Sequence, residues 1–552
     1  MIIVCGANKY FIFSDTIYKY VKKGVKNMEK SKKNAIVLSI VAVVTLIALV
    51  VGATYAYFKA QGGTGSSTEV KVTTYTTDML TFTTGNAISL YADQSSFGQE
   101  KGSLSGETFA KATLVANNKT NEATDNYYVY FNIENNTFKY TLGNDKPELI
   151  LTVTGPDGNE VTSLPGLTHK VVQDRENKSI SGFDVTTTNG IITIANKKTI
   201  TATTDAKEEQ YTLKLTFVNY EGDQTENATS TLSAKVMIQK NMIPFHEACN
   251  DNTLACHTAK LYTGTQGANN IYYHDATLTN GAGDSSYRYS GANPNNYVCF
   301  GSNESTCPTD NLYRIIGVFG NQVKLIKYDY GTTDELGTDG DYSKTYKEWG
   351  MYSTYKGTYG DGERIGVYYR NNTTQTNTWS ESLLNKTNLN TNFINNIGEE
   401  WANKIATTTW KVGGNTYSNI YSKTPSVVYQ NEIVNPVTTN TTDNATEYTA
   451  KIGLMYVSDY GFAAEPSAWT LTMDNYNNTT ATSTNWMYMG LMEWTISRNA
   501  DNSNFAFRVG RGGGVDNCYV LDYSAVRPSF NLESSITYVS GSGSASDPML
   551  IN

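Results

Sequence analysis

The sequence predicts a mainly β protein, in which one N-terminal transmembrane helix precedes a β-sandwich domain and then a domain of mixed α+β type. Three observations predict this class. Residues 34–58 are uncharged and strongly apolar, residues 69–240 contain runs that alternate apolar and polar side chains, and residues 241–552 add a helical repeat and five of the six cysteines. At 552 residues the chain is too long for one hydrophobic core, so at least two domains are expected.

The first element is a transmembrane helix at residues 35–58. A helix rises about 1.5 Å per residue, so about 20 residues cross the ~30 Å hydrocarbon core of a bilayer. Three lysines directly precede the run. By the positive-inside rule they keep residues 1–34 in the cytoplasm and place the rest of the chain outside. The same run also fits a signal peptide cleaved after Ala53 or Ala56, so both a single-pass anchor and secretion after cleavage stay open.

Translation is expected to start at Met28. Residues 1–27 match no targeting pattern, whereas residues 28–33 (MEKSKK) form a compact basic region directly before the apolar run. A purine-rich run of the kind found in bacterial ribosome-binding sites can encode residues 23–27. The alternative is that residues 1–27 are translated as a short cytoplasmic tail.

Charge is unevenly divided along the chain. The sequence has 43 Lys and Arg and 52 Asp and Glu; its first 58 residues hold eight of the basic and two of the acidic residues, which leaves 35 and 50 for the remainder. An acidic exported portion argues against nucleic-acid binding, which needs a basic surface. Excess negative charge also favours solubility.

Residues 59–68 form a Gly- and Ser-rich linker, and the β-sandwich is expected over residues 69–240. Strands are predicted at residues 127–133, 148–153, 190–194, 211–217 and 232–238. Along residues 211–217 (YTLKLTF) the apolar side chains occupy alternate positions, so one face is buried and the other is exposed to water. Several such strands between turn signals are typical of a sandwich.

Residues 52–58 (GATYAYF) resemble the export signal of the camelysin and TasA-type exported proteins of Gram-positive bacteria. Residues 109–114 (FAKATL) and 217–227 (FVNYEGDQTEN) resemble the strands and turn of the β-sandwich in those proteins. Sandwiches of that family polymerise into extracellular fibres by strand donation, so the resemblance implies an edge strand here that accepts a partner. We favour the simpler interpretation of a stalk that raises the following domain from the surface.

Two close cysteine pairs open residues 241–552: Cys249 with Cys256, and Cys299 with Cys307. Outside the membrane such pairs are expected to form disulfides, although the other pairings of these four cysteines stay open. Cys518 is left over, either as a free thiol or as half of an intermolecular bridge.

No metal and no cofactor is predicted. His246, His257 and His274 lie near the cysteine pairs, but neither pair has the short spacing of a zinc site, so zinc is the lesser interpretation. Four acidic residues in a Gly- and Tyr-rich stretch offer oxygen ligands of the kind that calcium prefers. They are Asp334, Asp339, Asp341 and Asp361. They match no calcium-loop motif, so a solvated acidic loop is expected.

One amphipathic helix is expected near residues 380–405, with apolar residues at every fourth position. These are Phe393, Ile397, Trp401 and Ile405. A hairpin is predicted from residues 311–319 and 323–327, around a turn at residues 320–321. Residues 329–378 are predicted to form long surface loops. Residues 510–514 (GRGGG) indicate a hairpin turn, because a phosphate-binding loop would precede a helix.

The order of elements over residues 245–552 resembles the C-type-lectin-like fold, in the variant shared with formylglycine-generating enzymes. The residues that carry the resemblance are 313–317 (YRIIG), 494–498 (WTISR), 514–515 (GV) and above all 526–532 (VRPSFNL). The enzyme branch uses two reactive cysteines near its C-terminal end, where this chain has only Cys518. The resemblance therefore implies a domain without the oxidase activity. Arg527 is expected to clamp a carboxylate or backbone carbonyls, with ligand contact as the alternative.

The predicted function is binding at the cell surface without catalysis. The sequence contains no HExxH, no GxSxG and no phosphate-binding loop before a helix. We expect a membrane-anchored or secreted protein whose C-terminal domain binds an extracellular carbohydrate or protein. A fibre subunit that self-associates by strand addition is the first alternative, and an exported hydrolase is the second.

Overall fold

A computed structural model of the chain describes residues 78–93, 96, 103–116, 122–143, 146–165, 167–203, 205–249, 251–304, 306–350, 355–357, 363–437 and 445–552. The transmembrane segment predicted at residues 35–58, the linker at residues 59–68 and the start at Met28 lie outside these residues. Within them, no helix is both long and apolar enough to cross a bilayer. The described chain is mainly β, as predicted.

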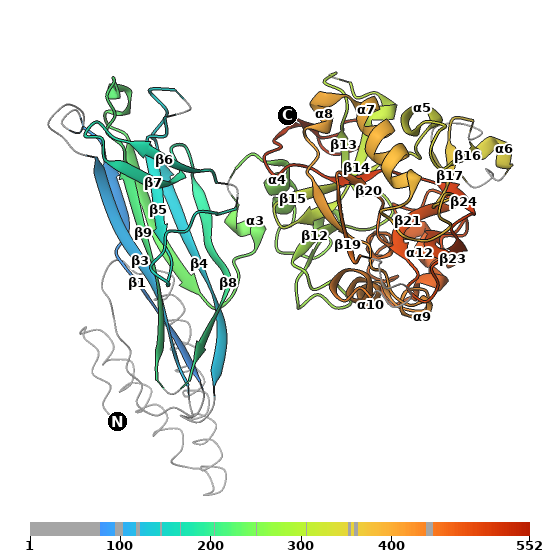
Figure 1. Ribbon diagram of the computed structural model, residues 1–552, viewed down its shortest axis with the longest axis horizontal. Coiled ribbons are helices and arrows are strands. Elements are labelled where there is room, and N and C mark those ends of the chain that lie inside the picture. The colour runs from blue at the N-terminus through green and yellow to red at the C-terminus, as the bar shows by residue number, and fades with distance from the viewer. Residues whose placement is uncertain are drawn as a thin grey trace, which may run out of the picture. The chain divides into compact units, whose positions relative to one another are not determined.

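In the described part of residues 79–239, two antiparallel sheets pack face to face around one core (Figure 1). The six-stranded sheet has the order β1 (Met79–Thr84), β3 (Leu104–Val115), β9 (Lys207–Phe217), β5 (Leu149–Thr154), β7 (Ser179–Asp184), β6 (His169–Gln173). The four-stranded sheet has the order β2 (Ile88–Tyr91), β10 (Thr231–Gln239), β4 (Ala123–Asn136), β8 (Gly190–Ala202). This arrangement is a β-sandwich.

Alternation of side chains along the strands builds the sandwich core. On β9, Leu213 and Leu215 are fully buried, whereas Lys214 between them is exposed. Leu213 pairs with Val153 of β5, so two branched side chains share the inner face of the sheet. The five strands predicted in this region are confirmed, although several extend further because polar residues continue the strands beyond the core.

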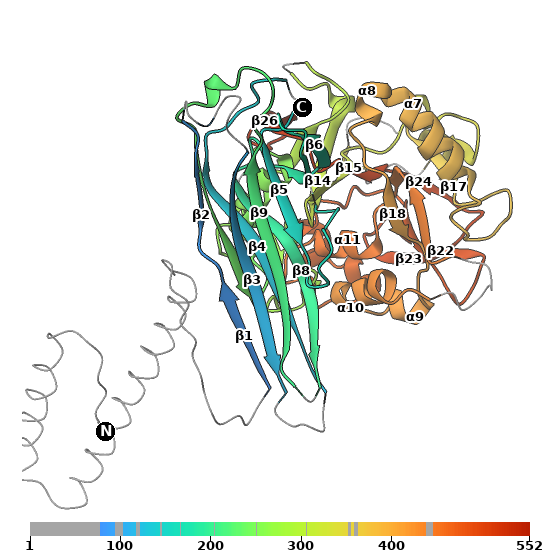
Figure 2. The same ribbon diagram turned by 60° about the vertical axis from the view of Figure 1, so that its left-hand side comes forward.

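The described part of residues 245–552 adds two large sheets, two two-stranded sheets and many short helices (Figures 1 and 2). One two-stranded sheet pairs β18 (Thr408–Lys411) with β19 (Glu447–Ala450). One large sheet has the order β11 (Ile271–His274), β12 (Ser286–Tyr289), β14 (Leu312–Phe319), β15 (Gln322–Lys327), β25 (Ser529–Asn531), β20 (Ile452–Gly453), with β13 (Tyr297–Cys299) beside β14. The other large sheet has the order β16 (Tyr342–Thr345), β17 (Gly366–Tyr369), β24 (Tyr523–Ala525), β21 (Glu493–Arg498), β22 (Phe505–Val509), β23 (Val515–Tyr519).

Short helices connect these strands. The α-helices are α3 (Phe245–Ala248), α4 (Leu254–Lys260), α5 (Thr333–Leu336), α6 (Tyr346–Trp349), α7 (Ile394–Ile397), α8 (Glu399–Ala402), α9 (Tyr417–Ile420), α10 (Pro425–Tyr429), α11 (Val457–Phe462) and α12 (Thr479–Thr484). Two segments are π-helical, η5 (Leu384–Phe393) and η6 (Gln430–Val434). Figure 2 shows α10 and α11 side by side.

Two predicted hairpins are confirmed in this region. Strands β14 and β15 pair around residues 320–321, where Gly320 adopts a φ of 63°. Strands β22 and β23 pair around residues 510–514, with the amide of Gly510 donating to the carbonyl of Gly514 at 2.8 Å. The glycine-rich segment is therefore a turn between strands.

The helix predicted near residues 380–405 is present, but it is interrupted once. The segment is π-helical through η5, continues as α7, and breaks at Gly398, whose φ of 81° is left-handed. Helix α8 follows and ends at Ala402. Three of the four residues predicted to form the apolar face of the predicted helix are buried, namely Phe393, Trp401 and Ile405. Ile397 is half-buried.

Residues 329–378 contain α5, β16, α6 and β17, so their prediction as surface loops is wrong in part. Tyr330, Tyr346 and Ile365 are fully buried in a small core of their own. Two capping boxes, at Thr332 and Thr345, begin the helices α5 and α6. Their T-x-x-E pattern was a sequence signal for these helices.

The beginning and the end of the C-terminal region lie together. The amide of Leu254 donates to the carbonyl of Ile536 at 2.8 Å, and Thr253 forms an isolated antiparallel β-bridge with Thr537. Thr537 in turn exchanges backbone hydrogen bonds of 3.1 Å with the last residue, Asn552. The strands β26 (Tyr538–Ser540) and β27 (Leu550–Ile551) close this corner.

Candidate functional site

Both close cysteine pairs are disulfides in the structure. Cys249 is bonded to Cys256 and Cys299 to Cys307, with the two Cα atoms 5.7 Å apart in each pair. The first links the end of α3 to α4, whose N-cap Thr253 accepts a hydrogen bond from the amide of Cys256 at 3.2 Å. The two crosslinks therefore tie local turns at the start of the C-terminal region.

Cys518 is a free thiol on β23 and is only 6% exposed. Its Sγ donates a hydrogen bond to a carboxylate oxygen of Asp522 at 2.7 Å. Burial, with a contribution from this contact, raises the pKa of Cys518 to about 12. Such a thiol holds almost no thiolate at neutral pH, so it is a weak nucleophile.

The three histidines near the cysteines do not come together. His246 contacts the hydroxyl of Tyr287 through Nδ1 at 2.7 Å, and His257 stacks on Tyr538 with the ring centroids 3.6 Å apart. His274 is fully buried beside Phe462. Over the described residues, no group of three or more His, Cys, Asp or Glu is placed to hold a metal ion.

His274 gives a testable pH dependence. Burial, assisted by the positive charge of Arg288, lowers the pKa of His274 well below 6.5. The unfolded chain therefore binds a proton below pH 6.5 that the native state does not take up. As the pH is lowered below 6.5, we expect the free energy of unfolding to decrease, by up to about 1.4 kcal/mol per pH unit from this residue.

The measurement compares urea unfolding of the wild type and of His274→Gln between neutral and mildly acidic pH. The difference in unfolding free energy between the two proteins should shrink as the pH falls, because only the wild type loses the stability contributed by the neutral, buried His274. Parallel pH profiles for the two proteins would contradict the assignment.

The acidic residues considered for calcium have separate structural roles. Asp341 is fully buried and accepts hydrogen bonds from the amides of Asn372 at 2.9 Å and Leu384 at 2.7 Å. Asp339 accepts from the side chain of Asn392 at 2.6 Å. Asp361 lies outside the described residues. The sequence predicted that Asp341 would lie in a solvated loop. This prediction is wrong, because Asp341 is part of the folded scaffold.

Arg527 clamps a carboxylate, as expected. Its Nε and Nη2 each donate to Glu493 at 2.8 Å, and Nη2 also donates to the carbonyl of Met487 at 2.7 Å. Arg527 and Glu493 are both buried, at 1% and 2% exposure. This bidentate pair connects the segment after β24 to β21, so the role of Arg527 is structural.

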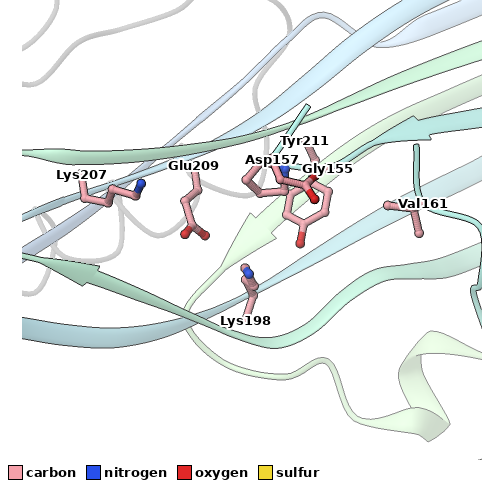
Figure 3. A pocket seen from close by; sticks show the side chains of 8 residues that line it. Gly155, Asp157, Val161, Lys198, Lys207, Glu209 and Tyr211 are labelled. Atoms are coloured by element: carbon pink, nitrogen blue, oxygen red, sulfur yellow. The ribbon is translucent and has the colours of Figure 1, made fainter. Parts of the chain in front are cut away.

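A hollow of about 410 Å³ lies on the sandwich, lined by residues of β8, of β9 and of the turn after β5 (Figure 3). Its lining residues are Gly155, Pro156, Asp157, Val161, Lys198, Lys207, Glu209 and Tyr211. Figure 3 shows the Lys198 side chain pointing from β8 toward Glu209 and Tyr211 of β9. The turn after β5 forms the remaining wall.

The pocket presents ammonium groups opposite a hydrogen-bonded carboxylate. Glu209 accepts a hydrogen bond of 2.7 Å from the hydroxyl of Tyr127, so part of its hydrogen-bonding capacity is already used. The charge of Lys198 interacts with that of Asp157, so the pocket holds two carboxylates beside its two lysines. Burial raises the pKa of Tyr211 to about 12, so its hydroxyl remains a neutral donor and acceptor. This set suits a ligand that carries both an anionic group and hydroxyls.

The sequence analysis did not identify this pocket, although a signal was present. Lys207 and Glu209 lie on the same face of β9 as Tyr211 and Leu213, because side chains alternate along a strand. Charged residues on the inward face of a sandwich are unexpected at the end of a core strand. Comparison with known proteins identifies no relative, because no family model, no curated protein and no solved structure matches the chain.

Proposed function

We propose that the chain is an exported cell-surface protein that binds an extracellular ligand and catalyses no reaction. The observation that carries the proposal is the pair of disulfides in a β-rich, acidic portion of the chain, because disulfides persist in oxidising compartments. The apolar run at residues 35–58 supports the same location, either as a single-pass anchor or as a cleaved signal.

The location can be tested by N-terminal sequencing of the protein from its native cells, separated into membrane and medium fractions. A chain that begins at Met28 and stays in the membrane supports a single-pass anchor. A chain that begins near Tyr57 in the medium supports secretion after cleavage. Recovery of the protein only from the cytoplasm, with its cysteines reduced, would overturn the proposal.

We place a small-ligand site at the sandwich pocket. Its volume of about 410 Å³ lies within the usual range of small-molecule sites. Lys198 and Lys207 supply positive charge, whereas Tyr211 and Glu209 supply hydrogen bonds to hydroxyl groups. The ligand class that this chemistry fits is a saccharide bearing a carboxylate or sulfate.

The double variant Lys198→Gln/Lys207→Gln should weaken binding to acidic glycans by about tenfold or more, because hydrogen bonds to charged groups contribute about 1.5–3 kcal/mol each. An array of neutral, carboxylated and sulfated glycans, probed with the full chain, gives the measurement. Lys235→Gln is the matched control, since Lys235 lies on another strand of the sandwich and pairs with Glu134.

Three outcomes of the array are distinct. Acidic-glycan binding that is lost in the double variant and kept in the control supports the pocket. Equal binding by all three proteins places the site elsewhere on the chain. No binding by the wild type to any glycan overturns the ligand class.

For the C-terminal region we propose a C-type-lectin-like domain with an adhesive role, raised on the sandwich as a stalk. Its charged residues support a scaffold role, since Arg527 and Glu493 pair with each other inside the fold. The weak nucleophilicity of Cys518 supports the non-enzymatic part of the proposal. The same array, probed with the double variant Lys198→Gln/Lys207→Gln, reports any glycan binding by the C-terminal region, because this variant lacks the lysines of the sandwich pocket.

A fibre subunit is the second candidate, and one observation favours it. Strand β6 is an edge of the six-stranded sheet and exposes 64% of Val171. An apolar edge strand is a site where another chain can add a strand. Electron microscopy of the purified protein should show filaments if this candidate holds, and Val171→Lys should abolish them; dispersed particles for the wild type exclude it.

A further inference from the structure

A buried cluster of charged residues lies inside the C-terminal region, away from the pocket on the sandwich. Lys324 is on β15, Asp459 is on α11 and Glu432 is on η6. Their exposures are 5%, 4% and 1%. Lys324 Nζ lies 2.5 Å from Oδ2 of Asp459, although the two residues are 135 positions apart in the sequence.

The surroundings of the Lys324 ammonium are aromatic. Its Nζ lies 4.4 Å from the ring centroid of Tyr456 and 5.3 Å from that of Trp410. Burial lowers the pKa of Lys324. A low-dielectric site disfavours separated charges, so transfer of a proton from the amine to the carboxylate costs less here than in water.

Arg288 holds the other oxygen of the same carboxylate. Its Nη1 donates to Oδ1 of Asp459 at 3.3 Å, and its Nη2 contacts Asp284 at 2.6 Å. Because Asp284 already balances the charge of Arg288, the pair of Lys324 and Asp459 can become neutral without leaving Arg288 unpaired. A guanidinium at Oδ1 stabilises negative charge that develops on this oxygen when a nucleophile attacks Cγ.

Glu432 supplies a further buried carboxyl group, which is hydrogen-bonded to the amide of the residue that precedes Asp459. It accepts hydrogen bonds from the amide of Ser458 at 2.7 Å and from the hydroxyl of Ser497. Its charge interacts with those of Lys324 and Asp459. Burial raises the pKa of Glu432 to about 7, so near neutral pH it can give and take back a proton.

We propose that Lys324 and Asp459 condense in the folded protein to an isopeptide bond, with Glu432 as the proton carrier. The amine of Lys324 attacks Cγ of Asp459, so that the Nζ–Cγ bond forms and the Cγ–Oδ2 bond breaks. The departing oxygen leaves as water with two protons, both of which come from the original ammonium. Glu432 relays a proton from nitrogen to the departing oxygen and ends in its starting state.

The reaction needs no oxidant, reductant or activating co-reactant, because an ammonium and a carboxylate contain all the atoms of one amide and one water. Its geometric requirement is proximity, which the fold supplies by holding the reacting groups together. The product would covalently join β15 to α11. This proposal is independent of the ligand proposed above.

The test is peptide mass spectrometry of the full-length protein after reduction of its disulfides and digestion with trypsin. The expected product is a branched peptide that joins residues 315–327 to residues 452–498 and lacks the mass of one water, with Lys324 protected from cleavage. Fragmentation locates the bond at Lys324 and Asp459. Linear peptides from the folded wild type, cleaved at Lys324, would overturn the proposal.

Glu432→Gln tests the proton carrier, because the amide retains hydrogen-bonding groups for Ser458 and Ser497. We expect this variant to fold, as judged by circular dichroism, and to form the crosslink about 100-fold more slowly or worse. An unchanged rate would remove Glu432 from the mechanism. Lys327 is an internal control: it lies 2.9 Å from Glu335, whose side chain is 22% exposed, and we expect it to be cleaved normally by trypsin.

Discussion

Replacement of Arg527 by methionine is expected to lower the free energy of unfolding of the C-terminal region by about 3–5 kcal/mol. The substitution leaves the carboxylate of Glu493 buried at 2% exposure without the guanidinium that now contacts both of its oxygens. An isolated buried charge is strongly unfavourable, so the carboxylate either takes up a proton or draws water into the fold.

Urea unfolding followed by tryptophan fluorescence gives the measurement. All seven tryptophans lie after residue 241, so their emission reports this region and not the sandwich. The double variant Arg527→Met/Glu493→Leu should recover much of the lost stability, because it removes both charges together. Lys411→Met in the exposed pair with Glu447 is the comparison for a surface pair and should change the free energy of unfolding of the C-terminal region by less than about 1 kcal/mol.

Phe530→Ala is expected to have an effect of similar size, about 3–5 kcal/mol, for a different reason. Phe530 is fully buried on β25, and its ring centroid lies 4.9 Å from that of Phe300 and 5.5 Å from that of Tyr313. Removal of the ring leaves a cavity among rigid aromatic side chains that cannot close over it.

The same fluorescence assay measures this loss. Phe530→Leu should cost less than the alanine substitution, because most of the volume remains. Val539→Ala is the surface control, since Val539 is 57% exposed, and it should leave the urea midpoint nearly unchanged. A midpoint for Phe530→Ala equal to that of the wild type would show that this ring cluster adds little to the core.

The strands of the sandwich could be predicted because each carries its own evidence. Alternation over residues 211–217 shows which side chains face inward, and β9 has that pattern in the structure. Helices such as α11 cannot be predicted from the spacing of apolar residues, because six residues are too few to show a 3.6-residue repeat. Within residues 451–457 only β20 is a strand, and α11 begins at Val457.

Sites were harder to predict than strands because their residues are far apart in the sequence. The role of Arg527 followed from its position in the VRPSFNL motif, but its partner Glu493 lies in another strand with no local sign of the pairing. The contact between Lys324 and Asp459 spans 135 residues. Only the folded sheet and helix bring such groups together, so neither the cluster nor the sandwich pocket was evident from local patterns.

The meeting of the two ends of the C-terminal region has an engineering consequence. Backbone hydrogen bonds hold Leu254 to Ile536 and Thr537 to Asn552, so this region starts and finishes at nearly one point. A unit with adjacent ends can be grafted into a surface loop of an unrelated host with short connectors, without stretching the host. Circular permutation is open to it for the same reason, with new ends cut at the exposed turn of Gly320 between β14 and β15.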